Sequence, residues 1–174
     1  MRIVGIFGAR GSGKSEAAKA ACSLGGWFRL SFAQPIRDML SAIGVPEARK
    51  HDKEPCLMGK TYRELITTLG SEWGRDMVHK SIWTTLMKEK ILHLDRRGAK
   101  GIVVDDVRFD NERKMLIKMG ASIARVVRLN HSVEGDHQSE HDWKLWSPDV
   151  VLLNDFHDNI DGWWKYTKKK INKL

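Results

Sequence analysis

Short apolar runs alternate with amphipathic segments along the whole chain. Five of these runs predict short buried strands, at residues 2–7, 27–32, 101–105, 122–129 and 150–153. Apolar residues at helical spacing predict helices between and after the strands, at residues 14–24, 35–43, from 62 onward, 82–97, 110–119 and 160–174. This alternation predicts an α/β fold, in which a parallel sheet carries helices on both faces.

Capping residues and glycines mark where several of these helices begin and end. Thr61 to Glu64 form a capping-box pattern, so a helix should start at Tyr62. Asp110 is expected to cap the helix that follows the third strand. Gly44 and Gly98 stand where two other helices should stop.

At 174 residues the chain has the length of one domain with its own core, so we expect a single domain over 1–174. The segment from about 33 to 98 is far longer than one crossover helix needs. It predicts a helical insertion on the sheet. Residues from about 129 to 148 are polar and loop-rich, and we expect them to form a small lid.

The turn after the first strand carries the most specific motif in the chain. Its residues satisfy every constraint of the phosphate-binding loop pattern G-x-x-x-x-G-K-[ST]: Gly8, Ala9, Arg10, Gly11, Ser12, Gly13, Lys14 and Ser15. Backbone N–H groups of such a loop surround phosphates, and the following helix adds the positive end of its dipole. The motif predicts that Lys14 reaches the β- and γ-phosphates of a nucleoside triphosphate and that Ser15 holds Mg²⁺.

Charge and composition exclude few classes of function. The formal net charge is +8 and the isoelectric point is about 9.6, which suits anionic partners in general. We found neither a signal peptide nor an apolar run that would span a bilayer, so we expect a cytoplasmic protein. Cys22 and Cys56 form no C-x-x-C pair, which leaves zinc and redox chemistry without a basis.

A phosphate-binding loop by itself fits kinases, GTPases and several classes of ATPase. The chain lacks the N-K-x-D segment with which a GTPase recognises guanine, and it is short for a ring or helicase ATPase. Small size and a helical insertion favour a kinase of small phosphorylated metabolites.

Several further segments resemble the bacteriophage deoxynucleoside monophosphate kinases. The most distinctive are the T-L-G-S-E-W-G-R stretch at 68–75 and the D-V-R-F-D-N-E stretch at 106–112, and the others are residues 31–36, 59–65 and 137–140. This resemblance implies a P-loop NMP-kinase-like fold and transfer of phosphate from ATP to a deoxynucleoside monophosphate, with Mg²⁺. It also implies a homodimer.

The resemblance and the strand pattern together suggest catalytic residues beyond the loop. Asp106 follows the third strand and could orient Mg²⁺, although its neighbour Asp105 could serve instead. Arg108 is expected to clamp the acceptor phosphate, and the alternative is an ion pair with Glu112. Arg128 ends the fourth strand beside the expected lid. Its guanidinium could contact the γ-phosphate there, and the alternative is an arginine that is only solvated.

The expected insertion supplies half of the residues that we predict to bind the acceptor nucleotide. Trp73 suits stacking on a base and Arg75 suits holding a phosphate, although Trp73 is almost as suited to core packing. Arg63 and Phe32 are weaker candidates, because a helix-face ion pair and a place in the core explain them equally well. Glu140 is assigned to the acceptor only through the family resemblance.

Two other patterns are better explained without a special function. His137 and His141 lie four residues apart, but no third ligand with convincing spacing completes a zinc site. The lysines of the last segment lie among tryptophans that fall on its apolar face, so they should form a solvated surface, and we expect no nucleic-acid partner.

Two other functions remain open at this point. One is a different small-metabolite kinase, of the dephospho-coenzyme A or shikimate kinase kind. The other is a nucleic-acid-stimulated ATPase, which the net charge of +8 would suit.

Overall fold

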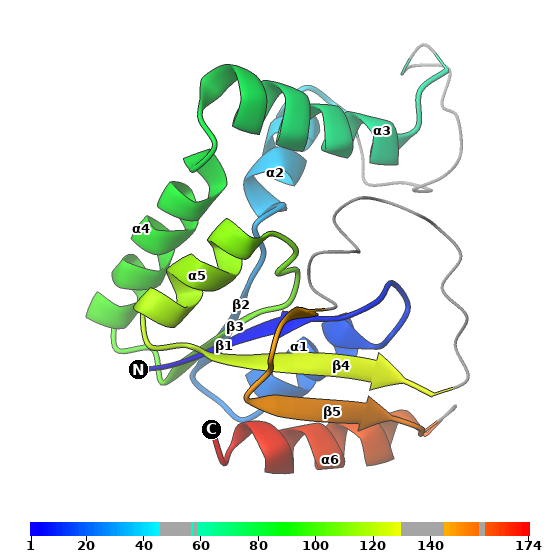
Figure 1. Ribbon diagram of the computed structural model, residues 1–174, viewed down its shortest axis with the longest axis vertical. Coiled ribbons are helices and arrows are strands. Elements are labelled where there is room, and N and C mark those ends of the chain that lie inside the picture. Colours follow the sequence, from blue (N-terminus) through cyan, green and yellow to red (C-terminus); the bar gives the residue numbers. More distant parts are fainter. Residues whose placement is uncertain (46–56, 58, 130–144, 157–158) are drawn as a thin grey trace. The chain divides into compact units, whose positions relative to one another are not determined.

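The computed structural model describes residues 1–45, 57, 59–129, 145–156 and 159–174. They form two compact units (Figure 1). The larger unit comprises residues 1–31 and 88–174, and the smaller comprises residues 32–87. The smaller unit thus falls within the segment expected to be a helical insertion, while residues 88–98 belong to the larger unit. Of the expected lid loop, residues 130–144 lie outside the described part of the chain, whereas residue 129 and residues 145–148 are described.

The larger unit is built on a five-stranded sheet in the order β2-β3-β1-β4-β5. Every neighbouring pair is parallel. The strands are β1 (Arg2–Phe7), β2 (Trp27–Leu30), β3 (Gly101–Val104), β4 (Ser122–Arg128) and β5 (Val150–Asn154). The predicted parallel sheet is confirmed, and the five apolar runs match the five strands to within two residues.

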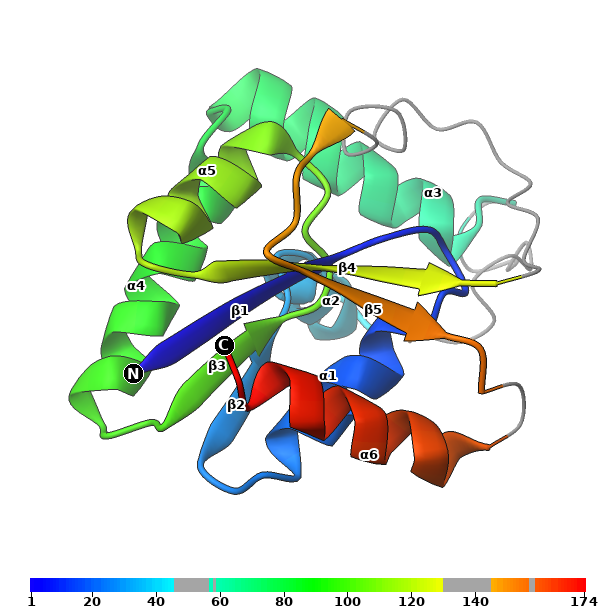
Figure 2. The same cartoon turned by 60° about the horizontal axis from the view of Figure 1, so that its bottom comes forward.

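Three helices pack on this sheet from opposite sides. Helices α1 (Lys14–Cys22) and α6 (Ile160–Ile171) lie together against one face, and α5 (Asp110–Lys118) lies on the other (Figure 2). Helix α1 lies close to the strands because its inward positions are all alanine, at 17, 18, 20 and 21, and each is fully buried. Trp163 of α6 belongs to the same core at 2% exposure, as the apolar spacing of the last segment predicted.

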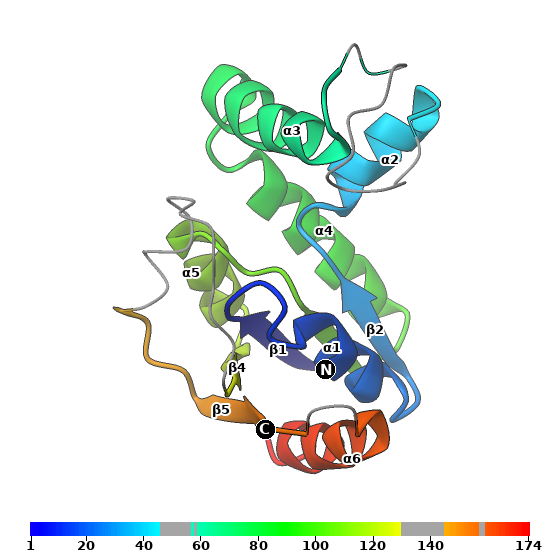
Figure 3. The ribbon, with the colours of Figure 1, turned by 90° about the vertical axis from the view of Figure 1, so that its right-hand side faces the viewer.

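The smaller unit is helical (Figure 3). It contains α2 (Gln34–Ala42), α3 (Tyr62–Thr67) and the π-helix η2 (Thr68–Val78), and it includes the first part of α4 (Ile82–Arg96). The capping box at Thr61 is present, since Thr61 Oγ1 accepts from the Glu64 N–H and the Glu64 carboxylate accepts from the Thr61 N–H. None of the helices in the described part of the chain is long and apolar enough to cross a membrane.

The π-helix was not predicted from the sequence. Its wider backbone brings two glycines against Trp83, which is 3% exposed. The Trp83 indole N–H donates to the Gly70 carbonyl at 2.7 Å, and a Cβ on Gly74 would lie 2.4 Å from Cζ2 of the same ring. π-helices are rare, and most are single-turn bulges within α-helices.

The prediction that Asp110 caps α5 was wrong. Asp110 is the first helical residue, and its carboxylate pairs with Arg113 and Lys114. The buried carboxylate of Glu112 performs the capping, since Oε2 accepts from the backbone N–H groups of Arg108 at 2.8 Å and Phe109 at 3.1 Å. The third residue of the helix therefore satisfies the two backbone amides that precede the helix.

Candidate active site

The phosphate-binding loop joins the end of β1 to the start of α1, in the predicted context. Gly8, Gly11 and Gly13 have φ angles of 146°, 73° and 102°, which L-residues with a side chain rarely adopt. A Cβ on Gly8 would lie 2.3 Å from the Val126 carbonyl oxygen of β4. The loop can therefore follow this path only with glycine at these positions. Gly13 is also the N-cap of α1. It has no side chain, so no N-cap side chain accepts from the first backbone amides of the helix.

The side chain of Lys14 folds back over the preceding loop. Its ammonium donates to the carbonyls of Gly8 at 2.9 Å and Ala9 at 2.6 Å, which holds the positive charge above the phosphate-binding turn. Ser15, the second residue of α1, is exposed. The uncapped helix N-terminus, the ammonium and the hydroxyl form a group that suits a polyphosphate with a bound cation.

A cavity of roughly 360 Å³ opens beside the loop, entirely within the larger unit. The loop and the start of α1 form one side of it, and residues from the ends of β4 and β5 and from the start of α6 form the rest: Arg128, Asn154, Asn159, Ile160 and Trp163. Within the described residues, the buried polar atoms Ser12 Oγ and Trp163 Nε1 have no hydrogen-bond partner. Buried polar atoms without partners are unusual and suit a site that awaits a ligand or water.

Sequence reasoning missed the part of this cavity that comes from β5 and α6. An asparagine at the carboxyl end of a predicted strand was an available signal, because ligands of open α/β sheets bind at those ends. Asn154 carries a polar side chain there and donates from Nδ2 to the Ser12 carbonyl at 2.9 Å.

The two aspartates after β3 have different surroundings. Asp105 is 4% exposed, and its Oδ2 accepts from Arg29 Nε at 3.0 Å and Arg29 Nη2 at 2.6 Å. Burial lowers the pKa of Arg29, but the hydrogen bond and charge of Asp105 outweigh it, so the net shift is upward. Asp106 is half-buried and accepts from the Ser31 hydroxyl at 2.6 Å. Asp105 is thus committed to its ion pair with Arg29, whereas Asp106 is less buried and accepts from a neutral hydroxyl. Its greater exposure makes Asp106 the better placed of the two for a ligand.

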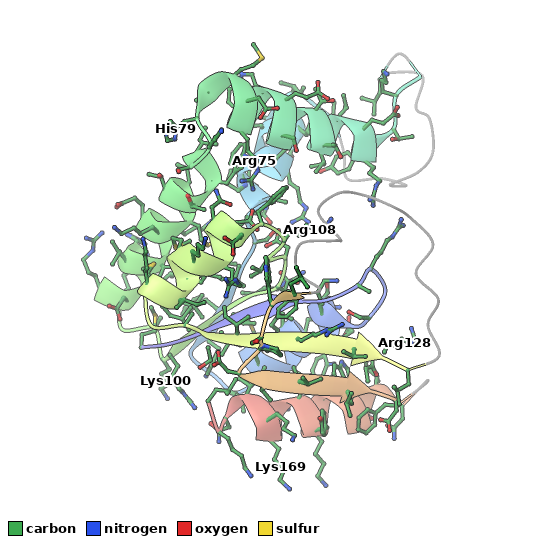
Figure 4. The ribbon with its side chains drawn as sticks, viewed as in Figure 1. Arg75, His79, Lys100, Arg108, Arg128 and Lys169 are labelled. Atoms are coloured by element: carbon green, nitrogen blue, oxygen red, sulfur yellow. The ribbon has the colours of Figure 1, made fainter. Side chains whose placement is uncertain are left out.

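Arg108 and Arg128 are both exposed (Figure 4). Arg108 follows β3 in the turn that Glu112 fixes, and Arg128 ends β4 at the cavity. Within the described part of the chain, neither guanidinium has an ion-pair partner. The alternative for Arg108, an ion pair with Glu112, is not observed, because that carboxylate bonds to backbone amides instead.

Four other predicted acceptor residues belong to the smaller unit. Trp73 and Arg75 lie on η2 and Arg63 lies on α3, and all three are half-buried. The Trp73 ring packs against Trp83 with centroids 6.3 Å apart, which agrees with the packing alternative for this residue. Phe32 is 5% exposed, and this burial favours its alternative place in the core.

Glu140, His137 and His141 lie outside the described residues. Among the residues that are described, no three His, Cys, Asp or Glu side chains are grouped so as to hold a metal ion. The lysine side chains of α6 include Lys169, which points away from the sheet (Figure 4).

Comparison with solved structures supports the fold. An unliganded crystal structure of a sugar kinase from Janibacter sp. HTCC2649 superposes with a TM-score of 0.52 at 14% identity, covering 99% of this chain and 95% of that one. At this level of identity, the likeness concerns the fold alone.

Comparison with sequences identifies the family. A "Putative deoxynucleotide monophosphate kinase" of Acanthamoeba polyphaga mimivirus is 25% identical over 171 residues, which cover 88% of this chain and 89% of that protein. The "Deoxynucleoside-5'-monophosphate kinase" of Escherichia phage T5 is 32% identical over 85 residues, 45% of this chain and 33% of that one. The family model described as deoxynucleotide monophosphate kinase matches residues 59–161, more than half of the chain. With the phosphate-binding loop at the end of β1, these matches establish that the chain belongs to the deoxynucleotide monophosphate kinase family.

Proposed function

We propose that this chain transfers the γ-phosphoryl group of MgATP to the phosphate of a deoxynucleoside monophosphate, producing a deoxynucleoside diphosphate and ADP. The observation that carries the proposal is the loop at the end of β1, in which a Cβ at Gly8 or Gly13 would clash and over which Lys14 places its ammonium. The substrate class follows from the family to which the chain belongs.

The phosphate tail of ATP occupies the loop in this proposal. Lys14 exchanges its two carbonyl partners for oxygens of the β- and γ-phosphates, and the amides of Gly11, Gly13 and the first turn of α1 donate to the remaining oxygens. The neighbouring cavity of roughly 360 Å³ then receives the nucleoside of the same ATP. Arg128 lines this cavity, so its guanidinium contacts the ATP there.

Mg²⁺ fits the oxygen donors that are present. It prefers few protein ligands alongside phosphate oxygens and water, which agrees with the lack of a cluster of acidic and histidine ligands in the described residues. We assign the Ser15 hydroxyl and the Asp106 carboxylate to the hydrated ion. When bound, Mg²⁺ neutralises charge on the β- and γ-phosphates.

The acceptor phosphate is held by cations in this scheme. We assign Arg108 to the acceptor phosphate. Within the smaller unit, Arg63, Arg75 and Trp73 are assigned to the acceptor nucleotide on the family resemblance alone. An acceptor phosphate is already ionised near neutral pH, so the reaction needs no strong general base. Positioning the acceptor oxygen in line with the γ-phosphorus and neutralising the transferred charge supply the rate.

The deciding experiment is to incubate the enzyme with MgATP and each deoxynucleoside or ribonucleoside monophosphate separately, and to follow diphosphates by chromatography. Diphosphate from at least one deoxynucleotide, lost in Lys14→Ala with an unchanged circular dichroism spectrum, is the expected result. Phosphorylation of shikimate or dephospho-coenzyme A instead would identify another kinase. ATP hydrolysis that rises with added DNA, without a phosphorylated small product, would identify the nucleic-acid-stimulated ATPase.

Two broader expectations accompany this proposal. The family resemblance suggests a homodimer, which sedimentation of the purified chain would test. If the gene is viral, as in the mimivirus and phage relatives, the enzyme would act in the cytoplasm of the host cell.

A further inference from the structure

Asn154, the last residue of β5, is not part of any motif that identifies the kinase family in this sequence. Its main chain is held in the sheet, because it lies opposite Arg128 of β4 and its carbonyl accepts from the Leu129 N–H at 3.4 Å. Its side chain extends from this fixed position to the phosphate-binding loop, where Nδ2 donates to the Ser12 carbonyl at 2.9 Å.

Gly13 makes this contact possible. A Cβ on Gly13 would lie 2.5 Å from Asn154 Nδ2 and 3.6 Å from Asn154 Cγ, so any larger residue would displace the amide. The glycine that opens α1 thus has a second role besides its φ of 102°, which is to admit a side chain from a strand that lies 142 residues away from Ser12 in sequence.

The bond fixes the orientation of a peptide group that belongs to the phosphate site. In a trans peptide the C=O and the following N–H point in opposite directions, and the described chain contains no cis peptide. Holding the Ser12 carbonyl toward β5 therefore directs the Gly13 N–H away from β5. Inside the loop, the Ser12 N–H donates to the Ala9 carbonyl at 3.3 Å, so the residue is held on both sides.

We propose that Asn154 is a positioning residue for the phosphate donor: its amide holds the Ser12–Gly13 peptide in the orientation that binds the polyphosphate. This inference rests on the proposed use of the loop for ATP. Asn154 also lines the cavity assigned to the nucleoside, but in this proposal it acts through the loop backbone, so its effect should depend on the phosphates of the donor and not on its base or sugar.

Inorganic tripolyphosphate separates this role from a direct contact with the nucleoside, since it carries the phosphates alone. We would measure binding of Mg-tripolyphosphate and MgATP by calorimetry for the wild type, for Asn154→Leu, which keeps the shape without the donor, and for Asn154→Ala. Asn172→Ala is the matched control, because Asn172 is also hydrogen-bonded, to Arg2, at the far end of α6.

The expected result is that both Asn154 variants bind tripolyphosphate and ATP about tenfold more weakly, by the same factor. KM for the deoxynucleoside monophosphate should stay unchanged, as should every constant of the control. Weaker binding of ATP with unchanged binding of tripolyphosphate would overturn the proposal in favour of a nucleoside contact. Unchanged binding of both, or equal losses for donor and acceptor with a lower melting temperature, would overturn it as well. Failure of the wild type to bind either ligand would instead refute the proposed function.

Discussion

The Arg29→Met substitution would leave the carboxylate of Asp105 buried without its partner. Asp105 is 4% exposed and receives two hydrogen bonds from Arg29, at 2.6 Å and 3.0 Å. Removing one partner of a buried ion pair costs roughly 3–5 kcal/mol, because the remaining charge is not solvated. The Arg29 side chain is 39% exposed, so water can enter its place and reduce this cost. We therefore expect the free energy of unfolding to fall by about 2–4 kcal/mol.

Urea denaturation followed by tryptophan fluorescence measures this change directly. A loss of about 3 kcal/mol corresponds to a melting temperature lower by roughly 6–12 °C in a chain of this size. Adding Asp105→Asn to Arg29→Met removes the buried charge, so the double variant should be more stable than the sum of the single changes predicts, by about 1–3 kcal/mol. Arg96→Met, at an exposed position of α4, is the control and should change stability by less than about 0.5 kcal/mol.

Replacing the neighbouring carboxylate, Asp106, should lower activity and leave stability almost unchanged. Asp106→Asn keeps an oxygen that can accept from the Ser31 hydroxyl, so its stability should stay within about 1 kcal/mol of the wild type. Loss of the negative charge beside the donor phosphates should lower kcat by about 10- to 100-fold at fixed Mg²⁺. If Arg29→Met is as stable as the wild type, or if Asp105→Asn loses activity while Asp106→Asn does not, the assignment of the two aspartates is wrong.

Three smaller changes test other parts of the structure. Gly101→Ala would place a Cβ 2.4 Å from the Trp27 ring, so the free energy of unfolding should fall by about 1–3 kcal/mol, and an unchanged urea midpoint would contradict this packing. The hydrogen bond from Lys114 lowers the pKa of Asp110, so Asp110→Asn should cost about 0.5 kcal/mol at neutral pH. Because a lowered pKa stabilises only the ionised form, this cost should vanish as the pH falls through the native pKa, and a pH-independent difference in melting temperature would argue against the pair. Gly8→Ala should abolish ATP binding by calorimetry because its Cβ would collide with a β4 carbonyl, and retained affinity would show that the loop can relax.

Local sequence patterns predicted the parts of the molecule that depend on nearby residues. The glycine spacing of the loop after β1 and the capping box at Thr61 both specify backbone geometry within a few residues, and both were confirmed. The π-helix η2 could not be predicted in this way, because its sequence also suits an α-helix. Packing of Gly70 and Gly74 against Trp83 accompanies the wider turn.

The missed features of the site depend on contacts between distant segments. The sequence left the choice between Asp105 and Asp106 open, because it did not show that Arg29 of β2 would pair with the former. The cavity beside the loop combines residues of β4, β5 and α6, and the order of the sheet decides that these ends meet. Apolar runs predict strands but carry no information about which strands become neighbours.

The central place of β1 has a consequence for how the enzyme is made. β1 is the first strand to leave the ribosome, yet both of its neighbours in the sheet, β3 and β4, are synthesised much later. The phosphate loop then gains its contact with Asn154 only when β5 has joined the edge of the sheet. Nascent chains that stop before β5 should therefore carry the complete glycine motif and still bind ATP more weakly than the full chain.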